Sequence, residues 1–255
     1  MHSNLLPDEF VAFDLETTGL NPKTDDIIEI AGVLFRQGLA VESFAEFAKP
    51  KKPPSAFVTQ LTGIRAEDLT GADAVSPVIS RFASFIGDRP LVAHNVGFDF
   101  KFLRQKINEF QLPEISNALF DSLLFSRLAL PGLLSYKLEN LAKYLNLPNL
   151  PNHRAGADAH ACGQVFMIAL ERLAAFPEDK RAALGRLVTA QETPTAHLIR
   201  KVVPASPKPV KPKRSFRTHE PLAPRDEMAP VSGAEIDRFF ESAGKLSSVV
   251  DSYEF

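Results

Sequence analysis

The sequence contains a single cysteine, Cys162, among its 255 residues. One thiol can form neither an intramolecular disulfide nor a thiolate metal cage, so a disulfide framework and a cysteine-ligated zinc site are excluded. Any metal must therefore bind through oxygen or imidazole ligands. The scarcity of cysteine is typical of a reducing compartment, and we expect a cytoplasmic protein.

Long apolar runs are also missing. None approaches the roughly 20 residues that a membrane-spanning helix needs. The first ten residues, MHSNLLPDEF, carry acidic side chains where a signal peptide would be basic and then apolar. We expect an unexported protein without a membrane partner.

Basic residues are not in excess, because 29 Lys and Arg stand against 31 Asp and Glu. Any polyanion site must therefore be local. The balance changes only in residues 201–230, which contain seven basic residues, three acidic residues and seven prolines. Such a segment buries too little apolar surface to offset the entropy of ordering, and it is typical of a semi-extended linker. We expect a folded domain at 1–200, a Pro/Lys-rich linker at 201–230 and a tail at 231–255.

The tail contains one short helical pattern, SGAEIDRFFESAGKL, in which apolar residues recur at helical spacing. A helix of this length does not fold alone, but its Phe239 and Phe240 suit docking in a partner's groove. A disordered terminus explains the same residues equally well. Both interpretations stay open at this point.

The folded domain begins with strand patterns and ends with helical ones. Segments 9–16, 26–37 and 39–49 are rich in Val, Ile and Phe, and a turn near Gln37-Gly38 predicts an antiparallel pair. An apolar strand at 90–95 leads directly into a helix, and helical patterns dominate from there, including one across 119–130. This order predicts an α/β protein with a mixed sheet flanked by helices.

Two acids interrupt the first strand, EFVAFDLETTG. Alternation places Asp14 and Glu16 on one face, about 6.6 Å apart along the strand. Their oxygens can converge on one divalent cation or on a pair of cations, and without a cation they repel each other. A solvated edge strand is the alternative. The apolar run before Asp14 argues against an edge.

Two further polar clusters follow. In HNVGFDFKFL a strand ends and a helix begins, with Asn95 available as N-cap and Asp99 near the first turn. In PNHRAGADAHACG, His153 precedes by five residues Asp158, which opens a long helix. Each acid alone could be a helix-dipole acid, and His94 alone could be a packed histidine.

The motifs FDLETTG, HNVGFDFKFL and HRAGADA, in this order, resemble those of the DEDDh 3′→5′ exonuclease family, typified by the proofreading epsilon subunit of bacterial DNA polymerase III. The resemblance spans about residues 9–175. It implies an RNase H-like fold with a mixed five-stranded sheet. In a sister branch a tyrosine stands one residue nearer the final aspartate, where this chain has Arg154, so the spacing favours the histidine branch.

The resemblance also implies the roles of the site residues. Four carboxylates would hold two Mg²⁺ or Mn²⁺ ions, with Asp14 bridging both, because hard cations prefer oxygen ligands. His153 would be the general base. Family positions that contact the substrate correspond to Thr17, Leu61, His94 and Phe98, whereas Thr62 replaces a histidine. The four carboxylates are Asp14, Glu16, Asp99 and Asp158.

The expected function is metal-dependent 3′→5′ hydrolysis of single-stranded DNA ends to nucleoside 5′-monophosphates, in replication proofreading or repair. An RNA 3′-end trimming exoribonuclease is the enzymatic alternative, because the sequence shows no group that would read a 2′-hydroxyl. A second alternative is a tethered interaction subunit of a polymerase complex. A single-stranded 3′ end is thus the expected ligand, and a DNA polymerase subunit is the candidate partner of the tail.

Overall fold

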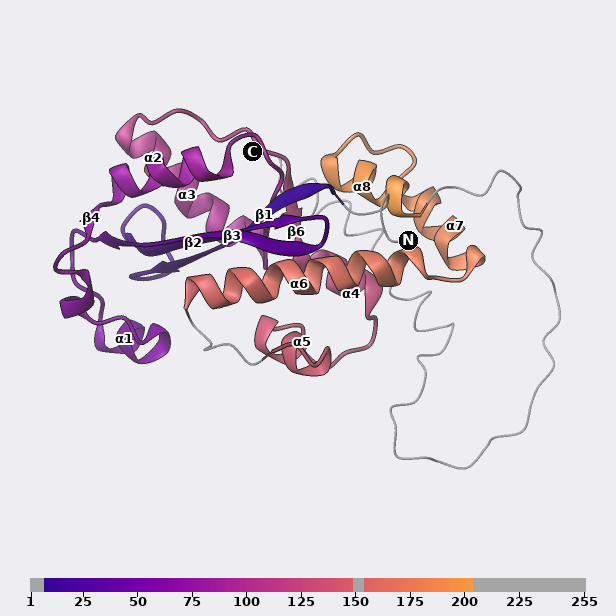
Figure 1. Ribbon diagram of the computed structural model, residues 1–255, viewed down its shortest axis with the longest axis horizontal. Coiled ribbons are helices and arrows are strands. Elements are labelled where there is room, and N and C mark those ends of the chain that lie inside the picture. The colour runs from indigo at the N-terminus through magenta and orange to yellow at the C-terminus, as the bar shows by residue number, and fades with distance from the viewer. Residues whose placement is uncertain (1–6, 149–153, 204–255) are drawn as a thin grey trace, which may run out of the picture. The chain divides into compact units, whose positions relative to one another are not determined.

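A mixed six-stranded sheet forms the centre of the computed structural model, which describes residues 7–148 and 154–203 (Figure 1). The order is β4-β3-β2-β1-β5-β6, with β1–β2 and β2–β3 antiparallel and the other pairs parallel. This confirms the α/β class and the antiparallel start. The strands are β1 (Glu9–Thr17), β2 (Ile27–Arg36), β3 (Leu39–Lys49), β4 (Asp73–Ala74), β5 (Leu91–Ala93) and β6 (Leu119–Asp121).

The expected strand number of five is too low by one for the described residues. β4 and β6 have two and three residues, so neither is long enough to show an alternating pattern. The helix expected across 119–130 was wrong at its start, because residues 119–121 form β6. Helix α4 begins after Asp121, whose side chain accepts a hydrogen bond from the Leu123 amide at 2.9 Å.

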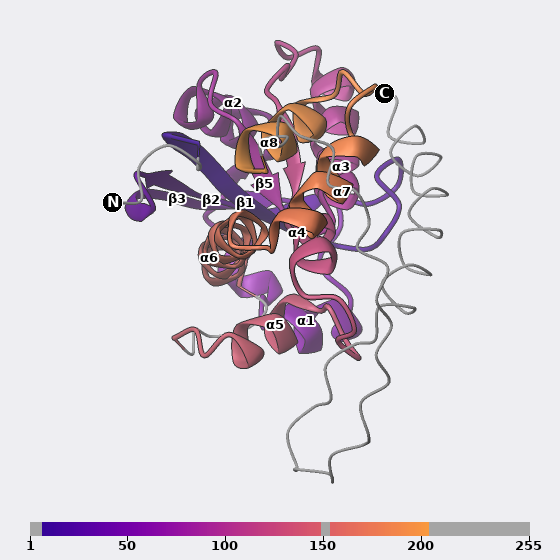
Figure 2. The same cartoon turned by 90° about the vertical axis from the view of Figure 1, so that its right-hand side faces the viewer.

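Helices cover both faces of the sheet (Figure 2). Helices α2 and α3 pack on one face, and α6 crosses the other, next to α4, α5 and α8. No helix among the described residues is long and apolar enough to span a bilayer. The helices are α1 (Ala56–Thr62), the 3₁₀ helix η1 (Ala66–Leu69), α2 (Val75–Ile86), α3 (Val96–Phe110), α4 (Ser122–Ala129), α5 (Leu138–Tyr144), α6 (Ala155–Ala174), α7 (Glu178–Leu187) and α8 (Pro194–Val202).

Strand β1 lies inside the sheet, paired on both sides with β2 and β5. Its Val11, Phe13 and Leu15 join the core under α2 and α3, whereas Phe10 and Ala12 join the core under α6. An edge strand with a solvated acidic face is therefore excluded. The predicted alternation is confirmed, and it directs both acids of β1 toward the α6 face.

Helix α6 approaches the sheet closely at Gly163. A Cβ atom there would lie 2.1 Å from the ring of Phe35 on β2, so only glycine allows this approach. The Phe35 ring stacks on Phe10 of β1 with centroids 5.0 Å apart. This close approach places the N-terminal half of α6, which contains Asp158, near the carboxyl end of β1.

Most of the predicted linker and the whole predicted tail lie outside the described residues. The domain boundaries at 200 and 230 therefore stay predictions. The same holds for the docking helix with Phe239 and Phe240.

Candidate active site

Three carboxylates meet where β1 ends and α6 begins. Each of Asp14, Glu16 and Asp158 offers an oxygen within 4.8 Å of the other two. The first two come from one face of β1, and Asp158 comes from the first turn of α6. Segments more than 140 residues apart in sequence thus place three hard oxygen ligands together.

Asp99 joins these acids from the first turn of α3. It is 4% exposed, and its Oδ1 accepts a hydrogen bond from the Leu15 amide, between the two acids of β1, at 3.1 Å. Its charge is among those that raise the pKa of Asp14. All four acids identified from the sequence are therefore neighbours in space.

The electrostatics of this cluster fit a divalent cation. Burial, and then repulsion by Asp99, Glu16 and Asp158, raises the pKa of Asp14 well above its ordinary value. Burial is also the main cause that raises the pKa of Glu16 to about 7 and that of Asp99 to about 8. Carboxylates that repel each other in a partly buried site gain most from a hard cation, so the donor set fits Mg²⁺ or Mn²⁺.

The raised pKa values make the metal-free protein less stable as the pH rises. Glu16 and Asp99 keep protons in the folded state up to about pH 7 and 8, but lose them near pH 4 when unfolded. Their contribution is therefore present at pH 4 and lost as the pH passes 7 and 8, at a cost on the order of 3 kcal/mol for Glu16 alone. In EDTA we expect the melting temperature to fall between pH 5 and pH 9, and Mn²⁺ to restore it at pH 8.5.

The Glu16→Gln variant is the control for this expectation, because it should show a shallower fall with pH in EDTA. A melting temperature that stays constant from pH 5 to pH 9 in the metal-free wild type would contradict it. Differential scanning calorimetry at several pH values gives both results.

Two of the expected substrate residues lie where β5 leads into α3: His94 directly follows β5, and Phe98 is in the first turn of α3. The His94 ring nitrogens lie 2.8 Å from the Ser122 hydroxyl and 2.8 Å from the Tyr136 carbonyl oxygen, and burial lowers the pKa of this imidazole. His94 is thus held as a neutral, hydrogen-bonded ring. Phe98 packs against Phe102, with ring centroids 5.2 Å apart.

The other two expected substrate residues lie nearer the surface. The Thr17 hydroxyl donates to the Gly19 carbonyl at 2.6 Å, at a bulge that ends β1 beside the acids. Leu61, on α1, is 47% exposed. The neighbouring Thr62 is buried and its hydroxyl donates to the Val58 carbonyl, so it does not stand in for the missing histidine as a free polar group.

His153, the expected general base, lies outside the described residues, so its role stays a prediction. The residue after it, Arg154, is the N-cap of α6, which begins at Ala155. Its guanidinium pairs with Glu29 of β2 at 3.1 Å. Sequence reasoning missed this pair, although Glu29 interrupts the apolar run IIEIAGVLF just as Asp14 interrupts its own strand.

Comparison with known sequences identifies the family. The RNase_T exonuclease family model matches residues 11–166, more than half of the chain. A PolC-type DNA polymerase III of Latilactobacillus sakei is 42% identical over 167 residues, which are 66% of this chain and 12% of that protein. The corresponding polymerase of Caldanaerobacter subterraneus is 35% identical over 198 residues, 76% of this chain and 14% of that protein. The chain thus spans only a small part of these relatives.

Solved structures show the same fold. Exonuclease X in complex with 5′ overhanging duplex DNA has a TM-score of 0.53 at 24% identity, covering 64% of this chain and 91% of that one. The nuclease domain of 3′hExo, a DEDDh family member bound to rAMP, has a TM-score of 0.58 at 18% identity, covering 66% and 94%. The expected RNase H-like fold is confirmed. The chain belongs to the exonuclease family, as its three sequence motifs predict.

Proposed function

We propose that this protein is a metal-dependent 3′→5′ exonuclease that hydrolyses single-stranded DNA ends to nucleoside 5′-monophosphates. The observation that carries the proposal is the convergence of Asp14, Glu16 and Asp158 within 4.8 Å, with Asp99 beside them. A cluster of carboxylates with raised pKa values is costly unless it serves a cation. Family membership supplies the reaction class.

In this proposal the four carboxylates would hold two Mg²⁺ or Mn²⁺ ions. When bound, the cations stabilise charge on the attacking and leaving oxygens of the phosphodiester. The buried hydrogen bond between Asp99 and the Leu15 amide keeps the start of α3 against the end of β1. His153 removes a proton from the attacking water, because an imidazole titrates near neutral pH.

The terminal nucleotide is proposed to lie against four residues, Thr17, Leu61, His94 and Phe98. The backbone after Glu16 and Thr17 contacts the nucleotide, His94 and Phe98 line its pocket, and Leu61 packs near its base. Leu61 and Phe57 are four residues apart on α1, and Phe57 is 72% exposed. An exposed aromatic ring suits stacking against an unpaired base, and an exposed leucine suits apolar contact with it.

A role in replication proofreading or repair is proposed from the relatives. They are named DNA polymerase III, and this chain matches 12–14% of their length. The proposal therefore includes a DNA polymerase subunit as partner, reached through the C-terminal tail, in the cytoplasm. The tail lies outside the described residues, so that contact rests on its sequence pattern alone.

Paired digestion of a 5′-labelled DNA oligonucleotide and its RNA counterpart tests the proposal. With Mg²⁺ or Mn²⁺ we expect stepwise shortening of the DNA from its 3′ end and release of nucleoside 5′-monophosphates. EDTA should stop the reaction, because it removes the cations that stabilise the charge on the phosphodiester.

Blocking the 3′ hydroxyl while leaving the 5′ end free is the control for polarity. A strong preference for RNA would replace the DNA assignment with 3′-end trimming of RNA. Undiminished cleavage in EDTA would contradict metal dependence.

A further inference from the structure

Three side chains form a row across the sheet, one from each of β3, β2 and β1. Glu29 is paired in register with Phe47 on one side and with Glu16 on the other. Directly opposed residues of antiparallel strands share a face, so Glu29 stands beside the active-site acid Glu16. Glu29 is 4% exposed, and like charges in this arrangement destabilise a sheet. A buried carboxylate here requires a cationic partner.

Arg154 is that partner. Its Nη2 donates to Glu29 Oε1 at 3.1 Å and its Nε to Oε2 at 3.4 Å, so the contact is bidentate. The guanidinium carbon also lies 5.4 Å from the centroid of the Phe47 ring, next to Glu29 in the row. Two parallel bonds and an aromatic face fix the direction of the guanidinium as well as its distance.

Glu29 also binds the first residue of α6. Its Oε2 accepts a hydrogen bond from the Ala155 amide at 3.2 Å, one of the amides that lack a partner within the helix. Asp158 follows Arg154 by four residues, about one helical turn. A single buried side chain of β2 thus holds the backbone from which an active-site acid projects.

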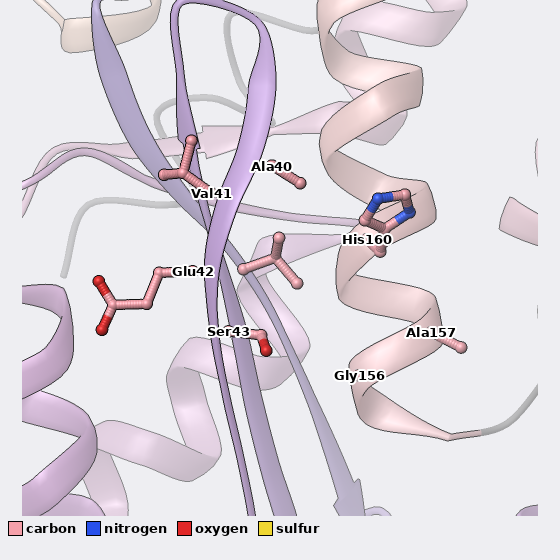
Figure 3. Close-up of a pocket in the computed structure, with 8 residues that line it drawn as sticks. Ala40, Val41, Glu42, Ser43, Gly156, Ala157 and His160 are labelled. Atoms are coloured by element: carbon pink, nitrogen blue, oxygen red, sulfur yellow. The ribbon is translucent and has the colours of Figure 1, made fainter.

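Packing alone does not hold this turn on every side. A cavity of about 540 Å³ lies between β3 and the start of α6, with Ser43 on one wall and Gly156, Ala157 and His160 on the other (Figure 3). On this side the first turns of α6 border an open groove rather than a closely packed interface. The hydrogen bonds of Glu29 therefore have more influence on where this turn lies than they would have in a filled interface.

We propose that Glu29 and Arg154 form a positioning clamp that holds the first turn of α6. The clamp keeps Asp158 close enough to Asp14 and Glu16 for the three carboxylates to bind the same cation. The inference rests on the proposed metal-dependent function and deepens it. Neither clamp residue is assigned to touch metal or substrate, so both are positioning residues. Loss of the clamp should weaken metal binding more than it slows the reaction at saturating metal.

Titration with Mn²⁺ tests the clamp in the full-length protein. For Glu29→Gln we expect the half-saturating Mn²⁺ concentration for DNA hydrolysis to rise roughly 10–100-fold, the usual effect of losing a residue that orients a metal ligand. The rate at saturating Mn²⁺ should change much less. Calorimetric Mn²⁺ binding without DNA should weaken by the same factor. Arg154→Lys keeps the charge but not the bidentate contact. Its half-saturating Mn²⁺ concentration should lie between those of the wild type and Glu29→Gln.

Arg81→Ala is the matched control. Arg81 also joins a helix to the sheet through carboxylates, Glu46 at 2.5 Å and Asp73 at 2.8 Å, but on α2. It should leave Mn²⁺ binding unchanged. An active wild type whose Glu29→Gln variant keeps wild-type Mn²⁺ affinity would overturn the clamp, even if that variant melts at a lower temperature. A wild type that neither binds Mn²⁺ nor digests DNA would instead overturn the proposed function.

Discussion

Replacing Asp14 with asparagine is expected to slow DNA hydrolysis by at least about 10³-fold while leaving the metal-free protein as stable as the wild type, or more stable. Asparagine keeps the shape of the side chain and removes one negative charge. Burial raises the pKa of Asp14, and repulsion by three acidic neighbours, Asp99, Glu16 and Asp158, raises it further. The unfolding temperature in EDTA at pH 8 should therefore rise or stay constant.

This opposite response of activity and stability separates a functional acid from a structural one. Replacing an acid that holds the fold together would lower both the activity and the stability. Asp88→Asn is the control, because Asp88 is an exposed acid in the turn after α2 and should affect neither measurement. Asp14→Asn with Mg²⁺-dependent activity near that of wild type would remove Asp14 from the metal site.

The same variant should lose binding of Mn²⁺ in calorimetry without DNA, since the proposal makes Asp14 a metal ligand. Retained tight binding of two ions, together with lost activity, would show that Asp14 acts on the substrate instead. The experiment therefore tests the metal role and the catalytic role independently.

Two of the four acids could be predicted from local sequence because they break a strong local pattern. Asp14 and Glu16 interrupt an apolar strand, and a period of two puts them on one face whatever the rest of the fold does. Asp99 and Asp158 each stand in the first turn of a helix, as expected. Their meeting in space is a long-range property, and it was inferred from the family resemblance rather than from local spacing.

Hydrogen bonds over long sequence separations could not be predicted in this way. His94 is held by the Ser122 hydroxyl and the Tyr136 carbonyl, 28 and 42 residues away. Asn95 precedes α3 as expected, but it adopts φ 68° and makes no side-chain cap. The backbone amide of Asn95 donates to the Asp121 side chain at the end of β6. That strand is too short for its pattern to be read from the sequence.

Glu29 shows the limit most clearly. It carries the same signal as Asp14, an acid within an apolar strand, yet its partner Arg154 lies 125 residues away. Sequence reasoning placed Arg154 only as the residue beside the expected base. The need of Glu29 for a cationic partner is apparent only from the register of β1 and β2, which places Glu29 opposite Glu16.

Replacing His153 with alanine is expected to reduce the rate of hydrolysis roughly 10²–10⁴-fold at saturating Mg²⁺, the usual contribution of a general base. His153 immediately precedes Arg154 in the chain, five residues before Asp158. Alanine removes the imidazole and none of the four carboxylates. Mn²⁺ affinity should therefore stay near that of the wild type, in contrast to the results expected for Asp14→Asn and Glu29→Gln. The melting temperature should also stay near that of the wild type.

Initial rates under single-turnover conditions, at a fixed pH and saturating metal, measure this effect without interference from product release. His197→Ala is the control, because His197 is an exposed histidine on α8 that pairs with Glu192 at 3.2 Å. It should digest DNA at the wild-type rate. An unchanged rate in His153→Ala would transfer the general-base role to another group. A large rate loss with unaltered Mn²⁺ binding would assign proton removal to His153 and leave metal binding to the carboxylates.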